Sequence, residues 1–282
     1  MFVLSVCNHK GGTGKTTTVI HVAAALGLSG RRTLVIDLDP QGFLTRTMGV
    51  EEPPPGSTVA ALFDPSADLG SMPLESVSGF DLLPSSSTLT KRMRELNEPT
   101  DVLWVREALQ RADLSYDVVL FDTAAAVTVY SLNALVASRH VVIPVLPEYQ
   151  AVVGAEQTFQ TTQLVEDKLN PRLASRHFLP TQVDARKRIH RTYQQYLREK
   201  YQELVLDNVI RTSTALAESR EGGTTVFDHD SSARGARDYA NVTDELLRRI
   251  RAVDSVDAEA PDRTEASIEA EDVPLPDEAL NS

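Results

Sequence analysis

The stretch His9-Lys10-Gly11-Gly12-Thr13-Gly14-Lys15-Thr16-Thr17 decides the fold. It lies between residues 2–7, whose apolar run predicts a strand, and residues 15–28, whose pattern predicts a helix. The three glycines let backbone N–H groups approach an anion closely, and the positive end of the new helix faces the same point. Residues 33–38 predict a second buried strand. This strand, loop, helix and strand form a βαβ unit with a phosphate-binding loop.

Apolar runs and helical patterns continue to alternate along the chain. Further strands are predicted at 80–84, 116–122, 140–146, 178–183 and 204–210. Helices are predicted at 88–96, 102–112, 127–136, 153–169, 192–201 and 233–251, with a short one near 58–63 in a loop region. We therefore expect one α/β domain over residues 1–251, with a doubly wound, mostly parallel sheet and helices on both faces, as in P-loop NTPases.

The charge of the chain is concentrated at its end. Residues 252–282 hold ten acidic residues and one arginine, which supply −9 of the net charge of −12. Three prolines and few large apolar groups accompany these acids, so we expect an acidic, disordered tail. The acidity of the whole chain therefore does not exclude nucleic acid as a partner of the domain.

Cysteine and hydropathy patterns exclude several classes of protein. The single cysteine, Cys7, rules out an intramolecular disulfide framework. No apolar run reaches the roughly 18 residues of a membrane span, and the start of the chain lacks a secretory pattern. We expect a cytoplasmic protein without membrane attachment, because an acidic tail is the opposite of a basic amphipathic anchor.

The phosphate-binding loop assigns roles to its side chains. Lys15 supplies a positive charge for the β- and γ-phosphates of a nucleotide, and the Thr16 hydroxyl is placed to bind Mg²⁺. A Gly-rich turn that binds nothing is the alternative. The common pattern G-x-x-x-x-G-K-[ST] is not strictly met, because His9 stands at its first glycine and a second lysine, Lys10, follows.

The stretch from Lys10 to Thr17 resembles the deviant Walker A motif of the ParA/MinD family of P-loop ATPases. The resemblance implies that Gly11, Gly12, Thr13, Gly14, Lys15, Thr16 and Thr17 bind ATP. It also implies that Lys10 reaches across a homodimer interface to the partner's nucleotide, the role that other NTPases give to an arginine finger. Dimerisation would then depend on ATP.

Two acids follow the second strand, in Asp37-Leu38-Asp39-Pro40-Gln41-Gly42. Strand alternation places Asp37 and Asp39 on one face, near the nucleotide crevice. The run resembles the second signature of the family, in its ParA branch, and this implies that Asp39 orients the attacking water while Asp37 lies near the Mg²⁺ shell. A helix-capping Asp–Pro turn is the alternative.

A third acid, Asp122, ends the apolar run 118–121, as in a Walker B motif, and is expected to hold Mg²⁺ directly or through water. The family usually continues with proline, whereas this chain continues with Thr123-Ala124-Ala125-Ala126. The resemblance extends over roughly residues 1–250, through further matches at Ser131–Leu135, Ile143–Tyr149 and Phe227–Tyr239. It favours the shorter, Soj-like proteins of the family, which lack an N-terminal helix-turn-helix domain.

The densest positive cluster is Arg186-Lys187-Arg188-Ile189-His190-Arg191, after Asp184-Ala185. In ParA-type proteins a matching Asp-Ala-Arg stretch contributes to nonspecific DNA binding, and this implies contacts of Arg186, Lys187, Arg188 and Arg191 with phosphates. A solvated loop is the alternative. The family often has a second DNA-contacting arginine where this chain has Ala215.

These observations predict a ParA/Soj-like ATPase that uses ATP and Mg²⁺. It would dimerise, bind double-stranded DNA nonspecifically on the nucleoid, and hydrolyse ATP slowly until a ParB-like protein or cargo adaptor stimulates it. Its cycle would position a chromosome, plasmid or other cargo. The alternative is an ATP-dependent regulator that acts on a protein partner without DNA. A nitrogenase-reductase-like electron carrier is excluded, since its bridging cluster needs two cysteines per chain.

Overall fold

The computed structural model describes residues 1–51, 53–54 and 56–259, with the side chains of 257–259 left out. Its strands form a seven-stranded sheet in the order β3-β4-β2-β5-β1-β6-β7. They are β1 (Phe2–Val6), β2 (Thr33–Asp37), β3 (Glu75–Val77), β4 (Phe80–Leu83), β5 (Val118–Asp122), β6 (His140–Val145) and β7 (Ser175–Pro180). Every pairing is parallel except β3 with β4, so the predicted doubly wound α/β fold is confirmed.

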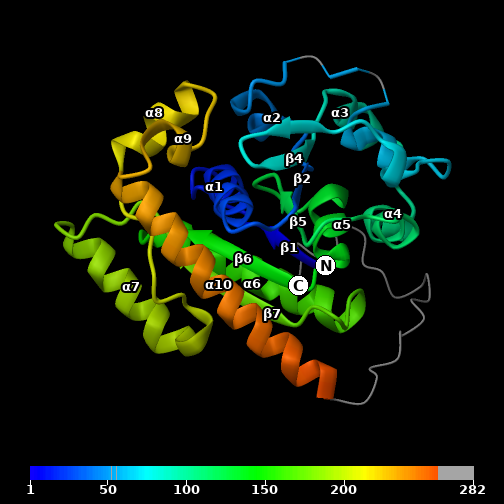
Figure 1. The fold of residues 1–282 in the computed structure, drawn as a ribbon. Helices are drawn as coiled ribbons and strands as arrows, with labels where there is room; N and C mark the ends of the chain where they lie inside the picture. The colour runs from blue at the N-terminus through cyan, green and yellow to red at the C-terminus, as the bar shows by residue number, and fades with distance from the viewer. Residues whose placement is uncertain (52, 55, 260–282) are drawn as a thin grey trace.

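The helices cover both faces of this sheet (Figure 1). They are α1 (Lys15–Leu28), α2 (Phe43–Thr47), α3 (Thr88–Arg92), α4 (Trp104–Arg111), α5 (Val129–Ala137), α6 (Tyr149–Lys168), α7 (Arg188–Tyr201), α8 (Thr214–Glu221), α9 (Val226–Asp230) and α10 (Arg234–Glu259). Short 3₁₀ turns occupy Val59–Phe63, Leu69–Ser71, Pro99–Leu103 and Gln202–Leu204. One apolar core joins the sheet to α1 and α10, and a second core joins its other face to α4, α5 and α6.

The candidate site lies at the carboxyl ends of the central strands. Val6 of β1 pairs with Asp122 of β5, and Asp122 pairs with Asp37 of β2. The carboxyl ends of these three strands therefore meet, and β1 leads from there directly into the loop before α1. β1 lies between β5 and β6, where the direction of winding changes, and this is where ligands bind in open α/β sheets.

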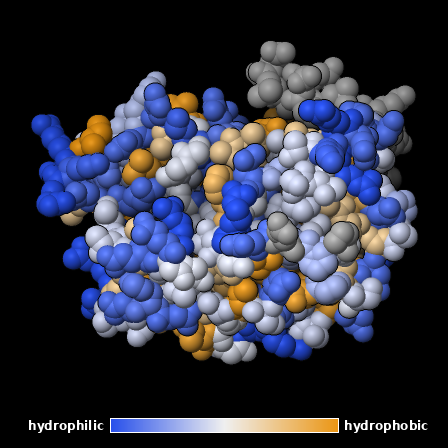
Figure 2. Space-filling view, turned by 90° about the horizontal axis from the view of Figure 1, so that it is seen from above, coloured by the Kyte–Doolittle hydropathy of each residue, from blue (hydrophilic) through white to orange (hydrophobic). Residues whose placement is uncertain are grey.

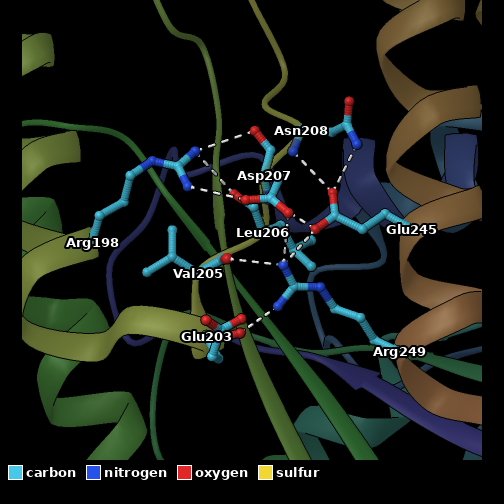
Figure 3. Close-up of polar contacts among 8 residues, drawn as sticks. All are labelled: Arg198, Glu203, Val205, Leu206, Asp207, Asn208, Glu245 and Arg249. Atoms are coloured by element: carbon cyan, nitrogen blue, oxygen red, sulfur yellow. Dashed lines mark hydrogen bonds and ion pairs between the residues drawn. The ribbon is translucent and has the colours of Figure 1, made fainter. Parts of the chain in front are cut away.

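The strand predicted at 204–210 is wrong. Leu206 and Ile210 donate backbone hydrogen bonds to Phe178 and Pro180, so the segment follows β7 at separate points only. Between these points, the N–H groups of Asp207 and Asn208 donate to the Glu245 carboxylate of α10 at 2.8 and 2.9 Å (Figure 3). An acid from a distant helix thus takes the donors that a strand ladder would need.

The same acid belongs to a larger polar cluster that joins α7, this segment and α10 (Figure 3). Glu245 is 2% exposed and pairs with Arg249 at 2.7 Å. Arg249 also donates to the Val205 carbonyl, and Arg198 donates to the carbonyls of Leu206 and Asp207. Burial is compensated here because each charged group has several partners.

Further differences concern helices. The sequence did not predict α2. It also did not predict α8 and α9, which lie in a polar stretch and pack on α10 through the small cluster Ala215, Val226 and Ala236. α10 continues to Glu259, eight residues past the predicted end at Arg251. The remaining part of the predicted acidic tail, residues 260–282, lies outside the described residues. In the part of the chain that is described, no helix has the length and apolar character that a membrane span requires.

Histidines buried in the sheet and in α1 should make the folded protein less stable at acidic pH. His177 of β7 is 5% exposed, neither ring nitrogen has a hydrogen-bond partner among the described residues, and burial lowers its pKa to about 4. Arg249 and His140 lower the pKa further, while Glu245 raises it. Because the unfolded chain takes up this proton near pH 6.5, stability is lost as the pH falls from about 7 to 5, by about 2 kcal/mol for this group.

We expect His177→Leu, an apolar replacement of similar volume, to be as stable as the natural chain at pH 7 and to lose about 2 kcal/mol less on going to pH 5. Urea denaturation at both pH values measures this difference. His21 is a second buried histidine with a pKa lowered to about 4, so the variant should keep part of the acid sensitivity. An unchanged pH dependence would show that His177 is not the source.

Candidate functional site

The loop between β1 and α1 is held in place by the strands and helix on its far side. The Asn8 amide donates to the Pro144 carbonyl at 2.7 Å and accepts from the Lys10 N–H at 2.8 Å. The His9 N–H donates to the Thr158 hydroxyl of α6 at 2.9 Å. Gly154 of α6 lies so close that a Cβ on it would be 2.9 Å from the Cβ of Lys10. The loop is therefore fixed before any ligand binds.

A second pair of contacts fixes the tip of the loop. After β7, the Thr181 hydroxyl donates to the Thr13 carbonyl at 2.7 Å, and the Gln182 amide donates to the Gly12 carbonyl at 2.7 Å. Gly12 and Gly14 adopt left-handed conformations, with φ of 78° and 88°, which favour glycine. Both residues line the same cavity as the loop. The sequence did not predict them, because its pattern placed them inside the strand expected at 178–183, whereas β7 ends at Pro180.

The cavity beside this loop has a volume of about 950 Å³ and is open to solvent. Its lining includes Gly11, Gly12, Gly14, Lys15, Thr16 and Thr17. Asp39 and residues 210–213 also line it. A volume of this size suits a ligand as large as a nucleotide. Six of the eight residues predicted from Lys10 to Thr17 thus share one cavity with the predicted Asp39.

The two lysines of the loop have different surroundings. Lys15 is 8% exposed, and its Nζ donates to the Lys10 carbonyl at 3.3 Å. Burial lowers the pKa of Lys15, while Asp122, Cys7 and Asp39 raise it. Lys10 is exposed instead, and its Nζ lies 3.4 Å from the Gln150 side-chain oxygen at the start of α6. Lys15 therefore lines the cavity, whereas Lys10 is not among its lining residues and is exposed where another molecule can reach it.

Asp122 has a free coordination position beside Thr16. The Thr16 hydroxyl donates to Asp122 Oδ2 at 2.7 Å, while Asp122 Oδ1 is buried without a hydrogen-bond partner among the described residues. Burial, followed by the charge of Asp37, raises the pKa of Asp122 well above its usual range. A buried carboxylate oxygen without a partner, next to a hydroxyl, fits a divalent cation that would compensate the charge.

This cation position has few protein ligands. Within the described residues there is no group of three or more His, Cys, Asp or Glu side chains that could hold a metal ion. Mg²⁺ is usually held by one or two protein oxygens together with substrate phosphates and water. Asp122 and Thr16 therefore suit a cation that arrives with a phosphate ligand.

Asp37 and Asp39 lie at the same strand end but differ in their contacts. Asp37 is completely buried, and its carboxylate accepts from the Asp39 N–H and from both the N–H and the hydroxyl of Thr45. Burial raises its pKa to about 6. Asp39 lines the cavity, and one of its oxygens accepts from the Gln41 N–H. Asp37 thus fixes the backbone that presents Asp39 to the cavity.

The segment after Asp122 also borders the cavity. The Thr123 hydroxyl donates to the Val6 carbonyl at 3.0 Å, which ties the segment to β1. Ala125 lines the cavity, and its Cβ lies 4.0 Å from where a Cβ on Gly11 would be. The stretch Thr123–Ala126, which departs from the family pattern, therefore lies beside the phosphate-binding loop.

The predicted DNA-binding residues lie on the loop between β7 and α7 and on the first turns of α7. Arg186, Lys187, Arg188 and Arg191 are all exposed. Ala215 is buried in the cluster between α8, α9 and α10, so it offers nothing to a surface contact. Arg211 donates to both oxygens of Asp238 and is already paired.

Comparison with known proteins bears on this site. The family described as "AAA domain" matches residues 1–175. The chromosome-partitioning ATPase Soj of Thermus thermophilus is 35% identical, over 88% of this chain and 96% of that protein. The chain belongs to the ParA/MinD family of P-loop ATPases. Its Soj-like branch is also represented by the sporulation initiation inhibitor protein Soj of Bacillus subtilis, which is 32% identical over 86% of this chain and 97% of that protein.

A solved structure supports the same fold for this ParA/MinD family member. Cobyrinic acid a,c-diamide synthase from Mycobacterium smegmatis, with bound ADP and magnesium, is 31% identical with a TM-score of 0.76. The match covers 89% of this chain and 96% of that chain. The resemblance inferred from Lys10 to Thr17 is thus confirmed at the level of the family.

Proposed function

We propose that this ATPase is a Soj-like positioning protein that binds ATP with Mg²⁺, dimerises around the nucleotide and binds DNA nonspecifically. The observation that carries the proposal is the contrast between Lys15, which lines the cavity, and Lys10, which is exposed and is not among its lining residues. A second lysine that its own site does not enclose is available to the nucleotide of a second chain. This arrangement favours a homodimer whose formation depends on ATP.

The reaction assigned to the site is hydrolysis of ATP to ADP and phosphate. Residues Gly11 to Thr17 would hold the phosphates, with Lys15 and the partner's Lys10 stabilising negative charge on the transferred group. Asp39 would orient the water whose oxygen forms the new bond to the γ-phosphorus as the bond to the bridging oxygen breaks. Asp122 and Thr16 would hold Mg²⁺, which neutralises phosphate charge, and Asp37 would fix Asp39 from behind.

The exposed cations Arg186, Lys187, Arg188 and Arg191 would bind DNA through its phosphates, without reading sequence. A ParB-like protein or a cargo adaptor would speed up an otherwise slow hydrolysis and release the dimer from the nucleoid. The supporting observation is that this chain matches both Soj relatives over nearly their whole length. One of these relatives is named a chromosome-partitioning ATPase, and we propose the same activity for this chain.

One observation favours the alternative, a regulator that acts on a protein partner without DNA. Arg186 and Lys187 are paired within the chain, and the position of a second family arginine holds the buried Ala215. The positive charge that DNA would meet is therefore smaller than the sequence suggests.

Binding to random duplex DNA tests the two functions. Fluorescence anisotropy would be measured without nucleotide, with ADP and with ATP–Mg²⁺, each across a salt series. We expect binding only with ATP–Mg²⁺, a steep decrease with salt, and loss of binding in Arg186→Ala and Lys10→Ala. Protein that binds ATP but no DNA at low salt in any nucleotide state would contradict DNA binding and favour the regulator.

A further inference from the structure

The main cations of the DNA-binding segment are occupied by acidic groups of the same chain. Arg186 Nε lies 3.0 Å from Asp184 Oδ1, and its Nη2 lies 2.8 Å from Asp184 Oδ2. The Arg186 N–H also donates to Asp184 Oδ1, at 3.0 Å. Two parallel N–H···O bonds are the geometry with which arginine binds a phosphate. Asp184 therefore offers Arg186 the same contacts that a DNA phosphate would offer.

A second acid approaches the segment from α6. Glu148, the residue before α6, has its Oε1 3.4 Å from Lys187 Nζ and 3.2 Å from His190 Nε2. The Arg191 guanidinium donates to the Ala185 carbonyl. The hydrogen bonds of Arg186 hold the pKa of Asp184 well below its usual range, and those of His190 and Lys187 lower the pKa of Glu148. Both acids are therefore charged at neutral pH.

His190 connects the two acids. It is 1% exposed, and its Nδ1 lies 3.1 Å from the backbone nitrogen of Asp184. Because that N–H can only donate, Nδ1 accepts, and these partners assign the proton of the neutral ring to Nε2. Nε2 then donates to Glu148. One buried ring therefore fixes the loop that carries Asp184 against the start of α6.

We propose that Asp184 and Glu148, held in place by His190, form an acidic clamp that occupies Arg186 and Lys187 until DNA phosphates displace it. This inference rests on the proposed DNA binding and adds its regulation. Asp184 and Glu148 compete with phosphates for the same donors, and His190 is a positioning residue that does not touch DNA. Each displaced carboxylate also remains near the phosphate and repels it. The clamp thus weakens DNA binding and favours ready release.

The same acid connects the clamp to the nucleotide loop. Glu148 is two residues from Gln150, whose side chain lies 3.4 Å from Lys10 Nζ. The start of α6 therefore contacts the exposed Lys10 and also carries one acid of the clamp. A nucleotide that engages Lys10 acts on the helix end that holds Glu148, so the clamp is placed where ATP can affect it.

Neutral variants of the full-length chain test the clamp. With ATP–Mg²⁺ and random duplex DNA, we expect Asp184→Asn to bind about threefold to tenfold more tightly than the natural chain, and Glu148→Gln to gain less. The salt dependence should steepen, by about 0.9 in the log–log slope for each additional phosphate contact. Glu107→Gln, on the exposed face of α4, removes the same charge far from the segment and should change neither quantity.

Two further comparisons separate competition from general charge effects. Adding Arg186→Ala to Asp184→Asn should remove the gain, because the freed arginine is its source. His190→Ala should raise the DNA affinity. His190→Gln, whose amide also offers an acceptor and a donor, should have nearly the same DNA affinity as the natural chain. The ATP affinity and the thermal midpoint of the two His190 variants should not differ in the way that their DNA affinities do. If the role of His190 were purely structural, these two quantities would change with the DNA affinity.

The outcomes for the clamp and for DNA binding are distinguishable. If the natural chain binds DNA and Asp184→Asn binds equally or more weakly, then Asp184 supports Arg186, and the clamp is overturned while the proposed function stands. If neither protein binds DNA although both bind ATP, the clamp and the DNA-binding function both fail. If only the variant binds, the clamp is supported in its strongest form.

Discussion

Replacing Lys15 by alanine is expected to lower ATP turnover at least about 1000-fold and to weaken nucleotide binding strongly. The side chain lines the cavity and is 8% exposed, and its charge lies near Asp122 and Asp39. Without it, Mg²⁺ at Asp122 and Thr16 would be the one cation of this chain's own site left to compensate the β- and γ-phosphates beside these acids. Phosphate release under single-turnover conditions, together with titration of a fluorescent ATP analogue, measures both effects.

Lys10→Ala provides the matched comparison, because it removes a lysine from the same loop at an exposed position. We expect this variant to bind ATP with nearly natural affinity as a monomer and to lose ATP-dependent dimerisation, as measured by light scattering. Stimulated hydrolysis should disappear with dimerisation. A Lys15→Ala protein that hydrolyses ATP normally, or a Lys10→Ala protein that still dimerises with ATP, would contradict the roles assigned to the two lysines.

Replacing Gly27 by alanine is expected to destabilise the protein by about 3 kcal/mol or more. Gly27 lies in the last turn of α1, and a Cβ there would be 2.1 Å from the Gly79 carbonyl oxygen in the turn before β4. The obstacle is backbone on both sides, so α1 or the turn must move. Because α1 begins at the phosphate-binding loop, movement of this helix should also weaken nucleotide binding.

Urea denaturation measures the destabilisation, and Gly222→Ala is the control. Gly222 follows α8 with ordinary backbone angles, and the nearest atom to an added Cβ is 3.4 Å away. We expect a change within about 0.5 kcal/mol for this variant. If the Gly27→Ala protein unfolds at the same urea concentration as the natural protein, then α1 and the β3–β4 turn are not packed as closely as in the structure.

Local sequence patterns predicted those parts of the fold whose hydrogen bonds are local or repeat along a strand. The helix Lys15–Leu28 and the buried strands ending in Asp37 and Asp122 are of this kind. The loop from Lys10 to Thr17 was predicted from the spacing of its glycines and lysines, although residues far along the chain hold it in place. The predicted strand 204–210 failed because Glu245, nearly 40 residues away, takes the donors of Asp207 and Asn208. No periodicity within the segment contains that information.

The same reason explains what was missed at the site. The sequence indicated that Arg186 and Lys187 are free cations, but Arg186 forms an ion pair with Asp184, only two residues earlier. The partner of Lys187 and His190 is Glu148, about 40 residues earlier, and only the packing of α7 beside α6 brings them together. Likewise, the sequence places Asp37 and Asp39 at one strand end, but only the packing of α2 shows that the N–H and hydroxyl of Thr45 occupy the Asp37 carboxylate.

The single thiol of the chain has a practical consequence. Cys7, the residue directly after β1, is 4% exposed, and burial raises its pKa to about 12. Thiol-directed reagents act on the thiolate, so they should leave the folded natural protein unlabelled. A cysteine introduced at an exposed position such as Ile189 would then be the one reactive thiol. Dyes or spin labels could therefore follow the DNA-binding segment through the ATP cycle without removing any native residue that the site uses.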